Sequence, residues 1–396
     1  MRALALTALV ALPLPALSET LSQEIARAGL ASVEARLTSL PTPNDADSFA
    51  LGGVLFLRAI EGSFQERWAL GLTDRTGMLP LLRLPLQDNP NPAPFDPAAI
   101  VTLFSNAEAR LVAAQATLAA IPETSDFAVE ISLADIWFDV NANATRNPGE
   151  GIGEILGAAV GAGSGDGTAT PLPVIRFDVA DAAWTAAYAN LLAGFCDLVR
   201  AYDPTEPLTR VLSARATMEA IGPVTPDPFL GGSGGLDGID LIAAVLATLD
   251  QTPDGAMMTA AHAHFLAMIA ENRQFWTRVA RESDNDREWL PNDRQASALG
   301  IDVPQATGPS WLAVLNDLEA VLKGDKLVPY WRVGAPAGVN VGRIFTDPRP
   351  IDLAGWIQGW AALPYLEKGP LLDSQSLDAF DMLTSGQAPL FALYLN

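Results

Sequence analysis

Residues 178–200, DVADAAWTAAYANLLAGFCDLVR, decide the fold class, because their apolar side chains repeat with the period of an α-helix. Large apolar residues stand three or four positions apart and therefore share one helix face: Trp184, Tyr188, Leu191, Phe195 and Leu198. Asp178 or Asp181 is suited to cap the helix, since a carboxylate accepts hydrogen bonds from the free N–H groups of the first turn. The segment predicts a long helix that buries this face in a core.

Helical periodicity extends over much of the chain on both sides of this segment. Before it, we expect a helix over 21–40 and a second helix that begins at Asp45 or Asp47 and runs to Ile60, with the helical pattern continuing over 65–72. A third helix is expected to begin with a capping box at Ser105–Glu108 and to run to Ile121. After it, we expect helices over 239–249 and 259–282, from Ser310 to Leu322 with Gly324 as the stop, and beyond Asp352. The predicted fold class is mainly α.

Strand-like segments are few and short. Residues 127–140 alternate in part between apolar and polar side chains, and residues 173–178 (PVIRFD) follow a flexible glycine-rich segment at 161–170. We expect these two segments to form a small hairpin-like β element that flanks residues 139–150. A further short strand is expected over 339–345. The chain after residue 18 is predicted to form a single compact helical domain, with a possible subdivision at the Pro- and Gly-rich residues 223–238.

The segment DVNANATRNPGE, residues 139–150, has the ligand spacing of a calcium-binding loop. Oxygen-bearing side chains stand at loop positions 1, 3, 5, 9 and 12, and position 7 offers a backbone carbonyl: Asp139, Asn141, Asn143, Asn147, Glu150 and Thr145. A hard cation takes roughly six to eight oxygen ligands, and this spacing supplies them from one turn of chain. The alternative is a polar turn rich in Asn that hydrogen-bonds only to itself.

Over these residues alone, the chain resembles the calcium loop of EF-hand and dockerin proteins. The resemblance implies that Asp139, Asn141 and Asn143 bind through side-chain oxygens and Thr145 through its carbonyl, that Asn147 binds directly or through a water, and that Glu150 is bidentate. Position 6, where the family has Gly because φ is positive, is Ala144. Because only two of these ligands are charged, we expect weak calcium binding, with a Kd on the order of 10⁻⁵ to 10⁻³ M.

The N-terminus has the pattern of a secretory signal peptide. Arg2 precedes an apolar stretch over 3–14, and Ala16-Leu17-Ser18 is a small-x-small cleavage site. The apolar stretch is interrupted by Pro13 and is shorter than the ~20 residues of a membrane span. We therefore expect cleavage after Ser18 and an exported protein, periplasmic or secreted, that is not inserted in a membrane.

The net charge of the chain disfavours two classes of partner, and its cysteine content limits how the fold can be stabilised. The formal net charge of −22 repels phosphate backbones and anionic lipid, so nucleic acid and membrane surfaces are disfavoured partners. The same charge attracts cations. Cys196 is the single cysteine and forms no internal disulfide, so stability in an oxidising compartment must come from packing and from any bound metal.

Two sequence motifs that form catalytic or metal-binding sites in other proteins are better explained here as a loop and as part of a helix. GGSGG at 231–235 matches the G-x-S-x-G pattern of a hydrolase nucleophile, but Pro226 and Pro228 exclude the strand that must precede it, so a flexible glycine loop is favoured. His262 and His264, the two histidines, lie two residues apart in a helical segment and point in nearly opposite directions. We expect His262 to pack in the core beside Phe265, and the spacing predicts no zinc enzyme.

Acidic residues gather at the expected end of one helix, at Asp284, Asp286 and Glu288. Negative charge is unfavourable at a helix C-terminus unless a cation or an arginine compensates it. Arg281 and Arg287 are close enough in sequence to do so, and Trp289 stands where a second calcium loop would need Gly. We expect a solvated helix end paired with arginine.

Two function classes remain open. The sequence favours a calcium-stabilised binding or scaffold protein whose ligand is an unknown protein, peptide or saccharide. The alternative is an exported hydrolase that acts on cell-wall or polysaccharide material through paired carboxylates such as Asp284 and Glu288. Trp356 and Trp360, one helical turn apart, would stack on a sugar if exposed or pack in the core if buried.

Overall fold

The computed structural model describes residues 19–72, 81–82, 84, 86–159, 172–224, 232–233, 236–300, 303–384 and 386. Within these ranges the chain forms twelve α-helices and only short antiparallel strands, which confirms a mainly helical fold with small β elements. No described helix is both long and apolar enough to cross a membrane. The signal-peptide prediction, the 161–170 segment and most of the GGSGG motif fall outside the described residues.

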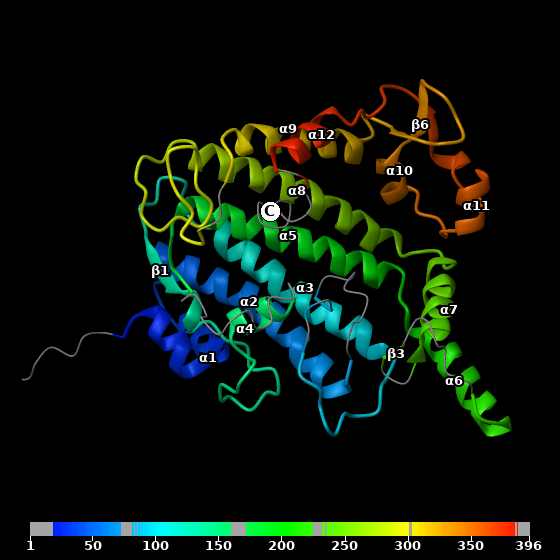
Figure 1. Cartoon of the computed structure of the whole chain (residues 1–396), viewed down its shortest axis with the longest axis horizontal. Helices are drawn as coiled ribbons and strands as arrows, with labels where there is room; N and C mark the ends of the chain where they lie inside the picture. Colours follow the sequence, from blue (N-terminus) through cyan, green and yellow to red (C-terminus); the bar gives the residue numbers. More distant parts are fainter. Residues whose placement is uncertain are drawn as a thin grey trace, which may run out of the picture.

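Helices stacked side by side form the body of the molecule (Figure 1). In order across the stack they are α1 (Leu21–Thr38), α2 (Asp45–Leu70), α3 (Ala98–Ala119), α5 (Val179–Ala201), α8 (Gly255–Val279) and α9 (Thr307–Lys323), with α12 (Gln375–Leu383) against α9. Helix α5 therefore lies in the middle, with α3 on one side and α8 on the other.

The predicted helix over 178–200 is α5, and Asp178 caps it in a capping box with Asp181. Its fully buried positions are mostly small residues, while the large side chains of the predicted stripe, such as Trp184 and Leu191, are only partly buried. Small residues let the neighbouring helices approach closely: a Cβ atom on Gly194 would stand 2.6 Å from Phe265 Cε1 of α8. The small residues, more than the large stripe, fix how α5 packs.

Two predicted helix starts are wrong at the capping residue itself, and α8 begins at Gly255, four residues before the predicted start at 259. Helix α3 begins at Ala98, where the Asp96 side chain accepts the Ala98 N–H, so Ser105 lies inside the helix and caps nothing. Helix α9 begins at Thr307, so Ser310 is likewise internal. In both cases the helical periodicity continues upstream of the capping residue. Gly324 does end α9 in the left-handed conformation, at φ 78°.

The predicted β element is present. Strand β1 (Val129–Ser132) pairs antiparallel with β2 (Val174–Phe177). A 3₁₀ turn, η1 (Leu133–Asp135), follows β1, and α4 (Ile152–Ala159) follows the 139–150 segment. A bridge between Trp137 and Gly151 closes the neck of that segment.

The C-terminal part carries the remaining elements. Helices α6 (Thr205–Ile221) and α7 (Gly238–Leu249) project from one end of the stack, with the short strands β3 (Gly232–Ser233) and β4 (Leu236–Asp237) between them (Figure 1). A small sheet of β5 (Val328–Pro329), β6 (Ala337–Val339) and β7 (Leu366–Lys368) is accompanied by α10 (Val341–Thr346), α11 (Leu353–Gln358) and η2 (Leu363–Tyr365). The strand expected over 339–345 is wrong, because Asn340 caps α10. Asp352 caps α11 as predicted.

Gly29 and Trp137 join α1 to the segment that leads into residues 139–150. Gly29 interrupts α1 with φ 75° and ψ 170°, a conformation that is essentially restricted to glycine. The Trp137 ring packs against it, so that a Cβ atom on Gly29 would stand 2.8 Å from Trp137 Cζ2. The buried indole donates to the Ile25 carbonyl at 2.9 Å.

Gly29→Ala is therefore expected to lower the free energy of unfolding by roughly 1–3 kcal/mol from backbone strain alone. The control is Gly53→Ala in α2, where a new Cβ would meet no atom within 4 Å. That substitution should raise the free energy of unfolding by about 0.5–1 kcal/mol, because alanine favours helix. Urea unfolding of both variants measures the difference. Equal stability of the two would contradict this packing.

Candidate functional site

Helix α2 holds the first residue of the 139–150 loop at both of its backbone polar groups. The Asp139 N–H donates to the Glu61 carboxylate at 2.7 Å, and Gln65 Nε2 donates to the Asp139 carbonyl at 2.8 Å. Glu61 is buried and also pairs with Arg58. Desolvation raises the pKa of Glu61. The loop thus starts from a fixed point on the helix stack.

The Asp139 side chain shapes the first half of the loop. Its two carboxylate oxygens accept the N–H groups of Asn143 and Ala144, at 2.9 and 2.8 Å. Ala144 has φ 57°, in the left-handed region that position 6 of the EF-hand loop requires. Alanine therefore adopts the conformation for which glycine is usual, and the strain is offset by the hydrogen bonds to Asp139.

Oxygens of three predicted ligands converge on one atom in the second half of the loop. That atom is Asn147 Nδ2, which lies 2.8 Å from the Thr145 carbonyl, 3.3 Å from Glu150 Oε2 and 3.4 Å from Asn143 Oδ1. Glu150 is only 3% exposed and also accepts the N–H groups of Val140 and Asn147.

The structure therefore brings Asn143, Thr145, Asn147 and Glu150 together. The Asp139 carboxylate and Asn141 Oδ1 instead accept backbone N–H groups in the first half of the loop. The calcium loop and the self-bonded polar turn both accommodate these hydrogen bonds. Calcium binding at Asp139, Asn141, Asn143, Thr145, Asn147 and Glu150 stays a prediction at this point.

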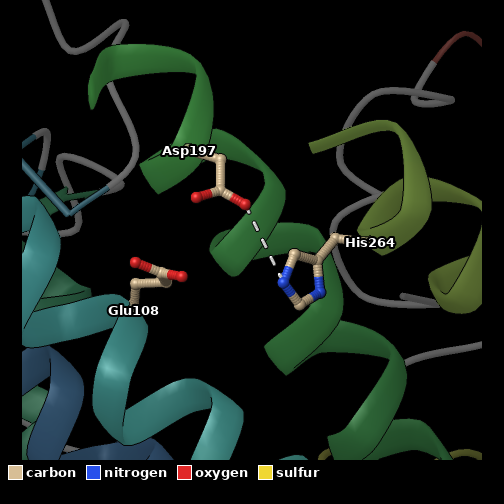
Figure 2. A group of neighbouring side chains, drawn as sticks. All are labelled: Glu108, Asp197 and His264. Carbon is tan, nitrogen blue, oxygen red and sulfur yellow. Dashed lines mark ion pairs between the residues drawn. The ribbon is translucent and has the colours of Figure 1, made fainter. Parts of the chain in front are cut away.

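A second polar group, which the sequence did not indicate, lies between three helices. Glu108 on α3, Asp197 on α5 and His264 on α8 point toward one another, and their ligand atoms all lie within 4.8 Å of one another (Figure 2). Asp197 is 2% exposed, and its Oδ2 atom faces His264 Nε2 at 3.9 Å. Arg200, one turn after Asp197, contacts both carboxylates.

Burial sets the charges of this group. It raises the pKa of Asp197 to about 6 and lowers the pKa of His264. At pH 7 the imidazole is therefore neutral, while Asp197 is ionised at a cost in desolvation. No local pattern indicates this group, because its members come from helices far apart in the chain. The one local signal is an aspartate in the middle of a helical segment rich in small apolar residues.

The two histidines separate as expected. His262 stacks on Phe345, with ring centroids 5.0 Å apart, and its Nε2 atom lies 2.8 Å from the Leu322 carbonyl. It is thus a packed histidine. His264 points the other way, toward α5.

Helix α8 ends at Val279, so the acidic residues lie beyond the helix end and not at it. Arginine does compensate them, but largely from another element. Arg176 of β2 lies 3.5 Å from Asp284 and 3.8 Å from Asp286, and Arg287 lies 3.5 Å from Asp286. Of the two carboxylates named for a hydrolase, Asp284 is exposed, whereas Glu288 is buried and accepts the Asp286 N–H. Burial raises the pKa of Glu288, and the negative charges of Asp284 and Asp178 act on it in the same direction.

Burial together with neighbouring negative charge raises the pKa of Glu282, beside this helix end, to about 7. The charges that act on it belong to Asp178, Glu288 and Asp284. The folded protein therefore binds a proton more tightly here than the unfolded chain does, so its stability falls as pH rises from about 4.5 through 7.

Glu282→Gln is expected to raise the free energy of unfolding at pH 8 by roughly 1 kcal/mol, because solvent screens this partly exposed side chain, and by much less at pH 4.5. Thermal unfolding over pH 4.5–8 measures this. Asp88→Asn, which removes an exposed carboxylate on the 86–97 connector, is the control and should shift neither end of the profile. A gain for Glu282→Gln that is the same at all pH values would contradict the raised pKa.

In the C-terminal part, one tryptophan packs against a neighbouring ring and two are exposed. Trp356 stacks on Tyr365, with ring centroids 5.9 Å apart, while Trp360 is 52% exposed and donates to Asp352 at 2.8 Å. Trp331 is 71% exposed and has the Arg332 guanidinium over its ring. Two exposed indole rings are thus present in this part of the chain.

Comparison of the chain with family models, with curated proteins and with solved structures gave no match. The functional interpretation consequently depends on the geometry of the 139–150 loop and of the polar group on α5.

Proposed function

We propose that the protein is an exported, calcium-stabilised binding or scaffold protein, with residues 139–150 as its calcium loop. The observation that carries this proposal is the convergence of the Asn143, Thr145 and Glu150 oxygens on Asn147 Nδ2. Several acceptors around one weakly positive N–H₂ group form the shell that a cation uses. Calcium would draw the same oxygens to about 2.3–2.6 Å.

Only a small change is needed for the loop to receive the ion. A half-turn of the Asn147 amide exchanges its nitrogen for its oxygen and adds an acceptor. Asp139 already holds the first half of the loop in shape, and the buried carboxylate of Glu150 closes the other end. The ion would neutralise both carboxylates.

Calcium at this place would stabilise the N-terminal part of the fold. The loop is fastened to α2 through Glu61 and Gln65, and Trp137 beside it is fastened to α1. The low affinity expected for two charged ligands suits an exported protein, since extracellular modules bind calcium at about 10⁻⁴–10⁻³ M.

A binding role also has support from the surface of the C-terminal part. Large apolar side chains are exposed around α11 and the small sheet: Trp331, Leu353, Ile357, Trp360 and Leu363. Exposed aromatic residues of this kind supply contact area to a peptide, protein or saccharide. The proposal thus joins a calcium-stabilised helix stack to a surface that binds the ligand.

Thermal unfolding of residues 19–396 in EGTA and in millimolar calcium tests the loop. We expect calcium to add about 1–3 kcal/mol of stability when its concentration is roughly ten to a hundred times the Kd. Asp139→Ala should abolish the increment, whereas the control Asp88→Ala, which removes a nearby exposed carboxylate, should retain it. No calcium-dependent shift in the wild type would reduce the loop to a polar turn.

Asn147→Asp separates the two interpretations of the loop further. In EGTA it removes the donor to the Thr145 carbonyl and should cost roughly 0.5–1.5 kcal/mol. In calcium the added charge should lower the Kd below that of the wild type, because ligand charge tunes affinity in such loops. Calorimetric titration measures the Kd. A variant that is destabilised equally with and without calcium would favour the polar turn.

A further inference from the structure

We propose that Glu108, Asp197 and His264 form a second metal site, separate from the 139–150 loop, for one divalent transition-metal ion of the zinc type. The site would lie in the helix stack, where α3, α5 and α8 meet (Figure 2).

The orientation of His264 follows from a chain of hydrogen bonds on α5. Asn190 Nδ2 donates to the Ala186 carbonyl at 3.0 Å, which leaves Asn190 Oδ1 as an acceptor. His264 Nδ1 lies 2.9 Å from that oxygen and must therefore carry the proton. In the neutral imidazole, Nε2 then presents a lone pair.

That lone pair faces another acceptor. Asp197 Oδ2 lies 3.9 Å from His264 Nε2, is buried, and accepts no hydrogen bond from the residues that the structure describes. A buried carboxylate oxygen without a partner is unfavourable, and a facing lone pair adds to the cost. A cation between the two atoms satisfies both.

The ligand types and spacing fit zinc better than calcium. Imidazole and carboxylate together are common zinc ligands, whereas calcium selects oxygen alone. Tetrahedral zinc with bonds of about 2.0–2.2 Å holds its ligand atoms roughly 3.3–3.6 Å apart. The separations here, 3.9 Å for one pair and none above 4.8 Å, require only a small inward movement of side chains. Three protein ligands leave the fourth position to water.

Surrounding residues supply the outer contacts that metal sites need. Asn190 fixes the ring of His264, as outer partners of ligating histidines commonly do. Arg200 contacts Glu108 and lies 3.4 Å from Asp197 Oδ1, the oxygen that does not face the imidazole. Arg200 thus orients the carboxylates, while its charge opposes that of the ion.

Zinc titration of residues 19–396 in excess calcium tests the site, with Co²⁺ absorption reporting the ligand geometry. We expect one equivalent of zinc and a tetrahedral Co²⁺ spectrum. His264→Ala and Asp197→Asn should weaken binding at least a hundredfold, and Asn190→Ala by about 10–100-fold. Arg200→Gln should bind more tightly than the wild type. His262→Gln, which changes the other histidine, is the matched control and should bind as the wild type does.

Several outcomes would overturn the site. If the wild type bound no zinc, the gap would be assigned to a bridging water. If His264→Ala bound zinc as well as the wild type does, His264 would not be a ligand. Asp197→Asn keeps the shape of the side chain and removes a buried charge, so circular dichroism should show it folded. Asp139→Ala should bind zinc normally, which separates this site from the calcium loop.

Discussion

The burial of α5 on both sides is the constraint on which the rest of the structure depends. Its small residues let α3 and α8 approach closely, and this excludes water from the polar side chains that α5 also carries. Each such side chain must then find a partner inside the stack. Thr185 bonds to the Asp181 carbonyl and Asn190 to the Ala186 carbonyl. Asp197 Oδ2 accepts no hydrogen bond from the described residues, and the proposed metal site is built on this atom.

Polar side chains of the 139–150 loop, at the edge of the stack, also need hydrogen-bond partners. The loop's carboxylates accept backbone N–H groups, and oxygens of Asn143, Thr145 and Glu150 also surround the amide of Asn147. Different cations are proposed for the loop and for the group on α5, because the loop offers oxygen alone and the group on α5 includes an imidazole.

Local patterns in the sequence were sufficient to predict much of the fold. Periodicity located the helices of the stack, and the capping residues Asp178, Asp352 and Gly324 lie where they were expected. Four of the predicted loop residues, Asn143, Thr145, Asn147 and Glu150, do lie together, because their spacing is local. The helix start predicted at Ser105 was wrong because a capping motif also occurs inside helices. Helix α6 was not predicted because it has hardly any buried face. Glu108, Asp197 and His264 meet only through tertiary packing, which no spacing rule reveals.

We propose that the acceptor atoms at these two places bind cations. Anomalous diffraction from a crystal of residues 19–396 grown with calcium and zinc tests this most directly. We expect a calcium peak about 2.3–2.6 Å from the oxygens of Asp139, Thr145 and Glu150. A zinc peak should lie about 2.0–2.2 Å from His264 Nε2 and Asp197 Oδ2. Water density without an anomalous signal at both positions would contradict this organisation.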